Sequence, residues 1–404
     1  MPELIVRPAT AADFDEFMRV SSAGFLQDYV PVEAERFRRA FGAHRFHLVL
    51  DEDEVIGTCG WFDRRITLPG GLSAPVAAVT AVTVKPGHRR RGALTRMMRT
   101  QLDELHAGGG AAVAALWASE GGIYGRFGYA PASHYLDLEV PTGTPFRAGV
   151  DLGTDRVLQL PRAEALVHIG TIYEQAVGQR AGRLERDDEA WELHLADGES
   201  QRDGSSPFRF AVHPDGYAVF RTRRGWNDRG PAGRIDVHEL VTTTPVAAAA
   251  VWRYLLDYDL VATVHAEAGV DDPVRQLLAD PRQAVGKHHD GLWVRLVDVD
   301  RALTARTYPT AIDTVVEVTD GFCPWNAGRR RLRAAADGPA EVTRCADPAD
   351  LALDVADLGA AYLGGPSLLA LADAGRAREL TPGALTALSR AFGADRPPHC
   401  PEVF

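Results

Sequence analysis

The sequence predicts three consecutive parts: an α/β domain over residues 1–143, a second α/β domain over 144–297 and an α+β domain over 298–404. Three observations favour this division. Strand-like and helix-like patterns alternate in the first part, as they do in α/β architectures. The same order of patterns returns after a Pro- and Gly-rich stretch over 140–149. Beyond about residue 298, strands separated by turns precede helices, and a chain of 404 residues has room for two or three domains.

The first part is expected to contain a strand, two helices, a hairpin and a later strand, over residues 3–9, 10–25, 31–41, 45–62 and 111–117. Between the hairpin and the later strand, the run over 75–84 is apolar and β-branched until Pro86 and Gly87 stop it, which indicates a buried strand. Apolar residues then recur at steps of three and four from Leu94 to Leu105, which predicts an amphipathic helix.

The turn between this strand and this helix holds three arginines and a glycine. A helix N-terminus presents unpaired N–H groups and the positive end of the helix dipole, which together attract anions. Arg89 and Arg90 would add charge-assisted hydrogen bonds to phosphate, and Gly92 would let the phosphate approach the backbone. The sequence has neither a Walker-type loop nor a Gly-x-Gly-x-x-Gly loop. The turn is therefore predicted to hold a pyrophosphate, and the alternative is a solvated run of surface charge.

This turn resembles the acyl-CoA loop of the GNAT acetyltransferases, Arg/Gln-x-x-Gly-x-Gly/Ala. Arg89 and Gly92 match it, whereas Leu94 stands where a small residue is usual. A second segment, "SEGGIYGRFGY", is similar to the aromatic signature near the end of a GNAT domain. The resemblance implies that Tyr124 protonates the departing CoA thiolate.

Two other aromatic residues of this segment, Phe127 and Tyr129, are expected to lie in the core.

The second part repeats the order strand, strand, helix and strand over residues 215–222, 234–241, 242–256 and 260–266. Thr244 is the expected N-cap of its helix, with Pro245 in the first turn. The segment "VTTTPVAA" at this turn offers neither arginine nor glycine, so a phosphate would find little charge there. We therefore expect a degenerate GNAT-like domain that does not bind CoA. The third part resembles a sterol-carrier-like domain, whose apolar residues form either a lipid groove or a plain core.

The composition limits the partners of the chain. A net charge of −11 argues against sequence-independent binding to nucleic acid and suits cationic substrates.

The N-terminal residues begin with a strand-like run and a capped helix, so we expect a cytoplasmic protein without a membrane anchor. The four cysteines are widely spaced and are expected to be reduced. His288 and His289 lie in "KHHDG" without a third ligand, which favours a solvated turn over a metal site.

The order of an active GNAT domain, a degenerate one and a sterol-carrier-like tail resembles the Eis family of actinobacterial N-acetyltransferases. The segments "VTVKPGHRRRGAL", "SEGGIYGRFGY" and "DGFCPWNAGR" support this resemblance. It implies acetyl-CoA as the donor, a homohexamer, and acetylation of aminoglycoside amines at several positions. Lysine side chains and peptides are the alternative acceptors. A CoA-sensing or lipid-carrying protein without activity is the alternative to an enzyme.

Carried over to this sequence, the resemblance implies that the backbone of Val82 and Val84 holds the pantetheine arm and thioester. The pyrophosphate would be held by the turn residues and the helix start, Arg89, Arg90, Gly92 and Ala93. An alkyl amine with a pKa of about 10 must lose a proton before it attacks a thioester, so the enzyme must also remove a proton.

The acceptor side of a GNAT fold is walled by the segment between the first two helices. Here that segment carries Asp28, Glu33 and Glu35. Acidic residues favour the first turn of a helix, which explains Glu33 and Glu35 equally well, so we choose Asp28 to attract the acceptor.

The end of the chain is the last candidate, because an apolar Phe404 follows a Pro-rich approach. In the Eis family, the C-terminal carboxylate reaches the active site and takes part in removing the acceptor's proton. We therefore expect the Phe404 carboxylate to act opposite Tyr124, with Glu402 helping to attract the cationic acceptor.

Overall fold

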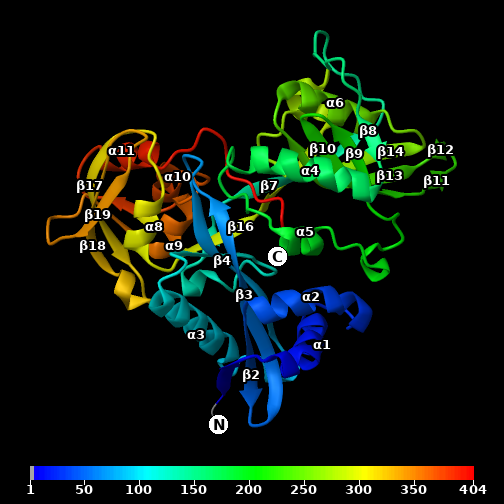
Figure 1. The fold of residues 1–404 in the computed structure, drawn as a ribbon. Helices are drawn as coiled ribbons and strands as arrows, with labels where there is room; N and C mark the ends of the chain where they lie inside the picture. Colours follow the sequence, from blue (N-terminus) through cyan, green and yellow to red (C-terminus); the bar gives the residue numbers. More distant parts are fainter. Residues whose placement is uncertain (1–3) are drawn as a thin grey trace.

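The computed structural model describes residues 4–404 as three lobes, each built around one sheet (Figure 1). The first sheet has seven strands in the order β1-β2-β3-β4-β5-β16-β6. In that order they are Ile5–Pro8, Arg45–Asp51, Glu54–Thr67, Ser73–Val84, Val113–Trp117, Leu292–Leu296 and Ala130–Pro131. Helices α1 (Phe14–Gly24) and α2 (Pro31–Ala43) pack on one face, and α3 (Ala93–Gly108) packs on the other.

The strand β4 and the helix α3 form where the sequence predicts them. The predicted apolar face of α3 is buried through Met97, Met98, Leu102 and Leu105, which pack against β3, β4 and β5. The helix ends at Gly109, whose φ of +62° is a left-handed conformation that glycine adopts without strain.

The second sheet also has seven strands, in the order β15-β7-β14-β13-β10-β9-β8. In that order they are Val285–Asp290, His134–Pro141, Val261–Gly269, Gly233–Thr242, Gly216–Arg223, Arg209–His213 and Leu158–Leu160. Helix α6 (Pro245–Leu256) packs on one face and α4 (Arg162–Val177) on the other. The remaining elements of this lobe are α5 (Asp188–His194), the hairpin β11 (Trp226–Asn227) and β12 (Gly230–Pro231), and α7 (Val274–Leu277).

The two seven-stranded sheets exchange strands across the expected boundaries at 143 and 297. Strand β16 lies within the expected second domain, yet it pairs with β5 and β6 of the first sheet. Strand β7 lies within the expected first domain, yet it pairs along its length with β14 and β15. The first and second lobes are therefore joined by shared strands as well as by a linker.

The edge strand β15 corrects a detail of the sequence analysis. The segment with His288 and His289 is not a solvated turn, because it pairs with β7 in a regular antiparallel register. Its residues are mostly exposed, so it has the polar composition of a turn without the geometry of one.

The third lobe has a five-stranded sheet in the order β19-β18-β17-β20-β21. In that order its strands are Ala340–Arg344, Gly328–Ala334, Ile312–Thr319, Leu351–Asp354 and Ala377–Glu379. Its helices are α8 (Val299–Ala305), α9 (Val355–Ala361), α10 (Leu368–Asp373) and α11 (Ala384–Ala391). Helix α9 packs on β16, so the cores of the first and third lobes are continuous. Within residues 4–404, no helix is both long enough and apolar enough to cross a membrane.

The end of the chain runs between the lobes after α11 and stops near α5 (Figure 1). It follows the segment 180–186: the His399 N–H donates to the carbonyl of Ala181 at 3.0 Å, and Arg180 Nε donates to the carbonyl of Pro397 at 2.9 Å. The same segment meets β3 on its other side, through the Ile66–Leu184 bridge. Residues 398–400 and Glu402 are thus buried between the lobes, whereas Val403 is exposed and Phe404 is partly buried.

Candidate active site

Strands β4 and β5 form an opening at the centre of the first sheet. They pair in parallel at only three positions, from Val76 with Val113 to Ala78 with Ala115. Beyond them β4 continues to Val84 and contains a bulge, where Ala81 has a φ of +53° and the register with β3 shifts. The Thr58 hydroxyl donates to the Ala81 carbonyl at 2.7 Å and holds the bulge in place. Because a bulge re-aims the backbone that follows it, Val82 and the residues after it are turned toward the opening.

A cavity of about 690 Å³ lies at this opening. It is lined by every residue predicted to bind the cofactor and by the predicted acid: Val82, Val84, Arg89, Arg90, Gly92, Ala93 and Tyr124. The structure therefore brings the two sequence motifs together in one site, although about thirty residues of chain separate them.

The arginine-rich turn leaves its hydrogen-bond donors available. Gly92 is the N-cap of α3 with a φ of +89°, and it has no side chain to satisfy the first N–H groups of the helix. Within residues 4–404, neither Arg89 nor Arg90 forms an ion pair with a carboxylate, and both are exposed. Arg91 instead donates to Asp51 at 2.6 Å, so two of the three arginines remain for a ligand.

Tyr124 lies on the far side of the cavity, at the start of the short turn Gly125–Phe127. Only 8% of its surface is exposed. Burial raises the pKa of its phenol to about 12, with smaller contributions from Cys59 and Glu120. The hydroxyl is therefore protonated at neutral pH. Phe127 and Tyr129 are almost fully buried in the core beneath it, which confirms their predicted structural role.

A second hollow of about 560 Å³ lies on the other side of α1, where the first and second lobes meet. The first lobe contributes Asp28, Tyr29 and Glu33, and the second contributes Leu193 and Ser200. The Ser200 hydroxyl donates to the Glu33 carboxylate, which ties the two lobes together.

The three acidic candidates of the acceptor segment differ in their contacts. Glu33 is engaged by Ser200, and Glu35 accepts from Arg38 at 2.9 Å. The Asp28 carboxylate is exposed and makes no hydrogen bond or ion pair within residues 4–404. Asp28 is thus the candidate whose charge is still available.

The structure corrects the expected role of Glu402. Its carboxylate is buried and accepts from Arg64 Nη1 at 2.8 Å and from Arg186 Nε at 2.7 Å. A carboxylate already balanced by two guanidinium groups has no charge left to attract a cationic acceptor. The arginine partners were missed because they lie far from Glu402 in sequence and outside every motif. Phe404 itself packs between the cores of the first and third lobes.

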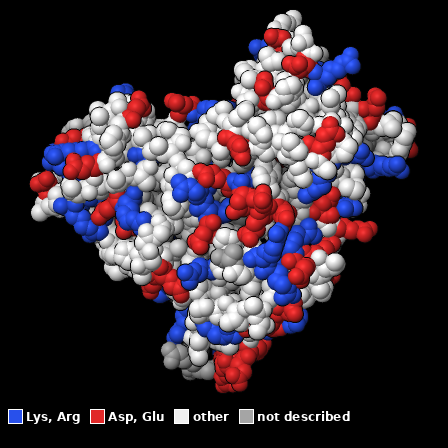
Figure 2. Space-filling view, in the orientation of Figure 1, with Lys and Arg blue, Asp and Glu red and all other residues white. Residues whose placement is uncertain are grey.

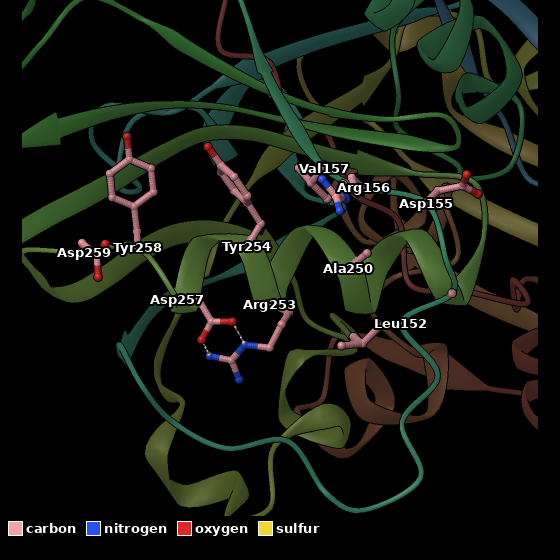
Figure 3. Close-up of a pocket in the computed structure, with 11 residues that line it drawn as sticks. Leu152, Asp155, Arg156, Val157, Ala250, Arg253, Tyr254, Asp257, Tyr258 and Asp259 are labelled. Carbon is pink, nitrogen blue, oxygen red and sulfur yellow. Dashed lines mark hydrogen bonds and ion pairs between the residues drawn. The ribbon is translucent and has the colours of Figure 1, made fainter.

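The second lobe has a hollow of its own, of about 660 Å³, beside the C-terminal half of α6 (Figure 3). Tyr254 of α6 and Tyr258, just beyond its end, project in the same direction, and Arg253 pairs with Asp257. This hollow lies at the opposite end of α6 from Thr244, so it is not the counterpart of the cavity at the start of α3. Among the described residues, no three His, Cys, Asp or Glu side chains are grouped as metal ligands.

A parallel strand pair that opens beside a bulge, followed by a helix start with open N–H groups, is typical of a GNAT acetyltransferase domain. Models of the GNAT acetyltransferase domain match residues 5–132 and 182–301, and a model of the sterol carrier protein domain matches residues 299–401. The chain is therefore an N-acetyltransferase with two GNAT domains and a sterol-carrier-like domain.

The chain belongs to the Eis family of these enzymes. It is 36% identical to N-acetyltransferase Eis of Mycobacterium tuberculosis (strain ATCC 25177 / H37Ra) over 396 residues, which cover 96% of this chain and 93% of that protein. It is 44% identical to an uncharacterized N-acetyltransferase of Streptomyces avermitilis, with 88% of each chain covered. The crystal structure of Eis1 from Mycobacterium abscessus covers the whole of both chains with a TM-score of 0.85 at 31% identity.

Proposed function

We propose that this protein transfers an acetyl group from acetyl-CoA to amino groups of aminoglycoside-like polycationic molecules. The main support is that the phosphate-binding turn, the bulged strand and Tyr124 line one cavity. A donor whose pyrophosphate lies at Arg89, Arg90 and Gly92 would extend its thioester along Val82 toward Tyr124. The residues present fit such a donor, because the first N–H groups of α3 and two guanidinium groups without a carboxylate partner can bind phosphate oxygens.

The acceptor is proposed to bind on the side of α1 opposite the donor. Asp28 offers a free carboxylate in the hollow shared by the two lobes. Acidic side chains also gather at the centre of the face in Figure 2, where α5 and the chain end lie in Figure 1. Helix α5 contributes Asp188 and Glu189 in its first turn. Such a field raises the local concentration of a polycation and is weakened by salt.

The reaction needs a neutral amine and a stabilised oxyanion. The ammonium form of the acceptor first loses one proton to give the neutral amine. Its nitrogen lone pair attacks the thioester carbon and the C–S bond breaks; a second N–H proton goes to the sulfur, so the products are an amide and the CoA thiol, with the first proton released. A backbone N–H of β4 beside the thioester would stabilise the oxyanion, and one such donor commonly contributes roughly 3–4 kcal/mol. The C-terminal carboxylate of Phe404 is proposed to accept or orient the ammonium proton.

Tyr124 is proposed to act on the leaving group. A phenol with a pKa of about 12 is a weaker acid than a thiol of about 8.5, so complete transfer of its proton to the thiolate is uphill. The phenol therefore acts mainly by hydrogen bonding to the sulfur as negative charge develops. The proton released by the amine restores the phenol if transfer occurs.

The test is incubation of the full chain with acetyl-CoA, a thiol reagent and a panel of aminoglycosides, polyamines and lysine peptides. We expect thiol release with aminoglycosides and a mass increase of several acetyl groups on one molecule. Preference for the peptides would replace this proposal with a protein lysine acetyltransferase. Absence of thiol release with every acceptor would leave a CoA-sensing or lipid-carrying role.

We further propose a homohexamer, on the basis of membership in the Eis family. Light scattering after size exclusion is expected to give six times the chain mass of 43.7 kDa. A monomer or dimer at micromolar concentration would contradict it.

A further inference from the structure

Glu402 makes hydrogen bonds through both its side chain and its backbone carbonyl. Its side chain accepts hydrogen bonds from Arg64 of β3 and from Arg186, which precedes α5. Its backbone carbonyl accepts from Trp117 Nε1 at 2.8 Å and from Cys400 Sγ at 3.3 Å. One residue is therefore fixed through both its side chain and its main chain, by groups from the first and second lobes.

The contacts continue into the second sheet. Arg186 also donates to Glu239 of β13, at 2.7 and 3.1 Å, and the Tyr217 hydroxyl donates to the same carboxylate at 2.7 Å. The Arg186 and Glu239 side chains are fully buried, and those of Glu402 and Arg64 are 4% and 8% exposed. Two guanidinium and two carboxylate groups balance one another, so the whole set is satisfied without an external partner.

Only two residues follow this anchor. A chain segment spans at most about 3.3–3.6 Å per residue, so the terminal carboxylate stays within about 7 Å of Glu402. The anchoring group Trp117 is the last residue of β5, which borders the opening beside β4. Confinement to a sphere of that radius corresponds to a local concentration on the order of 1 M.

We propose that Arg64, Arg186 and Glu402 are positioning residues that hold the C-terminal carboxylate of Phe404 at the acceptor side of the active site. This inference rests on the proposed role of that carboxylate. The buried ion pairs have a function in catalysis, because they convert a chain end that would otherwise fray into a fixed catalytic group. Glu239 of the second lobe contributes to this positioning, because its ion pair holds Arg186 in place.

The size of the effect follows from the next anchor along the chain. Without the Glu402 contacts, the terminus would be tethered from His399, whose N–H donates to Ala181. A flexible segment of five residues has a root-mean-square span of about 12 Å, compared with about 8 Å for two residues, so the local concentration falls about fourfold.

The first experiment compares Glu402→Gln with the native protein. Glutamine keeps the shape but turns an NH2 group toward one of the two arginines, so one hydrogen bond is lost. We expect kcat to fall by at most about fourfold, the limit set by release of all the Glu402 contacts, while the Kd of acetyl-CoA is unchanged. Arg183→Lys is the matched control, since Arg183 is a buried arginine of the same segment that donates to Ala176 and not to the tail. If the control lowers kcat as much as Glu402→Gln, the effect is general destabilisation and the inference fails.

The decisive comparison is a double-mutant cycle with a protein that lacks Phe404. If Glu402 acts by positioning Phe404, Glu402→Gln causes no further loss of kcat once Phe404 is absent, because the carboxylate that it positions has been removed. Independent, multiplying losses would overturn the inference. Native kcat in Glu402→Gln combined with a slow Phe404 deletion would also overturn it and leave the proposed catalytic terminus intact.

The remaining outcomes separate this inference from the proposed function. Native kcat in the Phe404 deletion would refute the catalytic terminus itself, and the positioning role with it. Arg64→Lys provides a milder second variant if Glu402→Gln does not fold, since Arg64 lies at the edge of the buried set. It is expected to show the same pattern in the cycle, and multiplying losses would again count against the inference.

Discussion

The two GNAT domains contain the same order of strand, turn and helix. They differ in whether the first N–H groups of the helix have hydrogen-bond partners. In the first, Gly92 caps α3 without a side chain, so the first N–H groups are available. In the second, Thr244 caps α6, and its hydroxyl accepts from the Ala247 N–H at 3.2 Å. Pro245 at the first helical position removes another donor altogether. The first helix start therefore leaves its donors open, whereas at the second one donor is satisfied by the Thr244 hydroxyl and one is absent.

The strands before the two helices, β4 and β13, also differ in the residue that each presents after a bulge. Both have a shift in register with the preceding antiparallel strand, at Ala81 in β4 and at His238 in β13. Beyond the bulge, β4 presents Val82 to the donor cavity. Beyond its own irregularity, β13 presents Glu239, which is ion-paired with Arg186. The second domain therefore holds at this position the carboxylate of Glu239, whose partner Arg186 also pairs with Glu402.

The largest expected effect is on chemistry in the first domain. Tyr124→Phe should lower kcat by about 10²–10³, the usual loss for one hydrogen-bond donor to developing negative charge, and leave the Kd of acetyl-CoA nearly unchanged. Tyr258→Phe in the hollow of the second domain is the matched change and should leave kcat unaltered. Steady-state kinetics with calorimetric donor binding checks both, and equal effects of the two variants would remove the distinction between the domains.

The next effect concerns the arginine turn. The double change Arg89→Ala and Arg90→Ala should weaken acetyl-CoA binding by roughly 100-fold or more, since each charge-assisted hydrogen bond contributes about 1.5–3 kcal/mol. The matched control is Arg329→Ala with Arg331→Ala, one exposed and one half-buried arginine of β18, both paired with carboxylates. Unchanged donor affinity in the first pair would mean that the turn is a solvated run of charge.

The helix cap of the second domain should affect stability alone. Thr244→Ala leaves the Ala247 N–H without its partner and is expected to lower the free energy of unfolding by about 1 kcal/mol. Chemical denaturation measures this loss, and the Kd of acetyl-CoA should stay at its native value. A weaker donor affinity in this variant would show that the second turn takes part in binding.

The smallest expected effect is at the acceptor side. Asp28→Asn should raise the KM of a polycationic acceptor by roughly two- to fivefold, the scale of an exposed charge pair, and should leave the KM of acetyl-CoA unchanged. Glu35→Gln serves as the control because that carboxylate is already paired with Arg38. Equal changes in both Michaelis constants would refute the assignment of Asp28.

The local parts of the site could be predicted because their signals are local. Pro86 and Gly87 end β4, apolar spacing defines α3, and Thr244 caps α6 as expected. The exchange of β7 and β16 between sheets could not be predicted, because the residue pattern of a strand does not identify the strands with which it pairs. The partners of Glu402 were missed for the same reason, because they come from distant parts of the chain.

The measurement that tests the central claim most directly is the stoichiometry of acetyl-CoA binding by calorimetry. The account predicts one molecule per chain, bound at the start of α3, and loss of that binding in the protein with Arg89→Ala and Arg90→Ala. Two molecules per chain, or one molecule whose affinity is unchanged in that protein, would contradict the claim that only the first GNAT domain holds the donor.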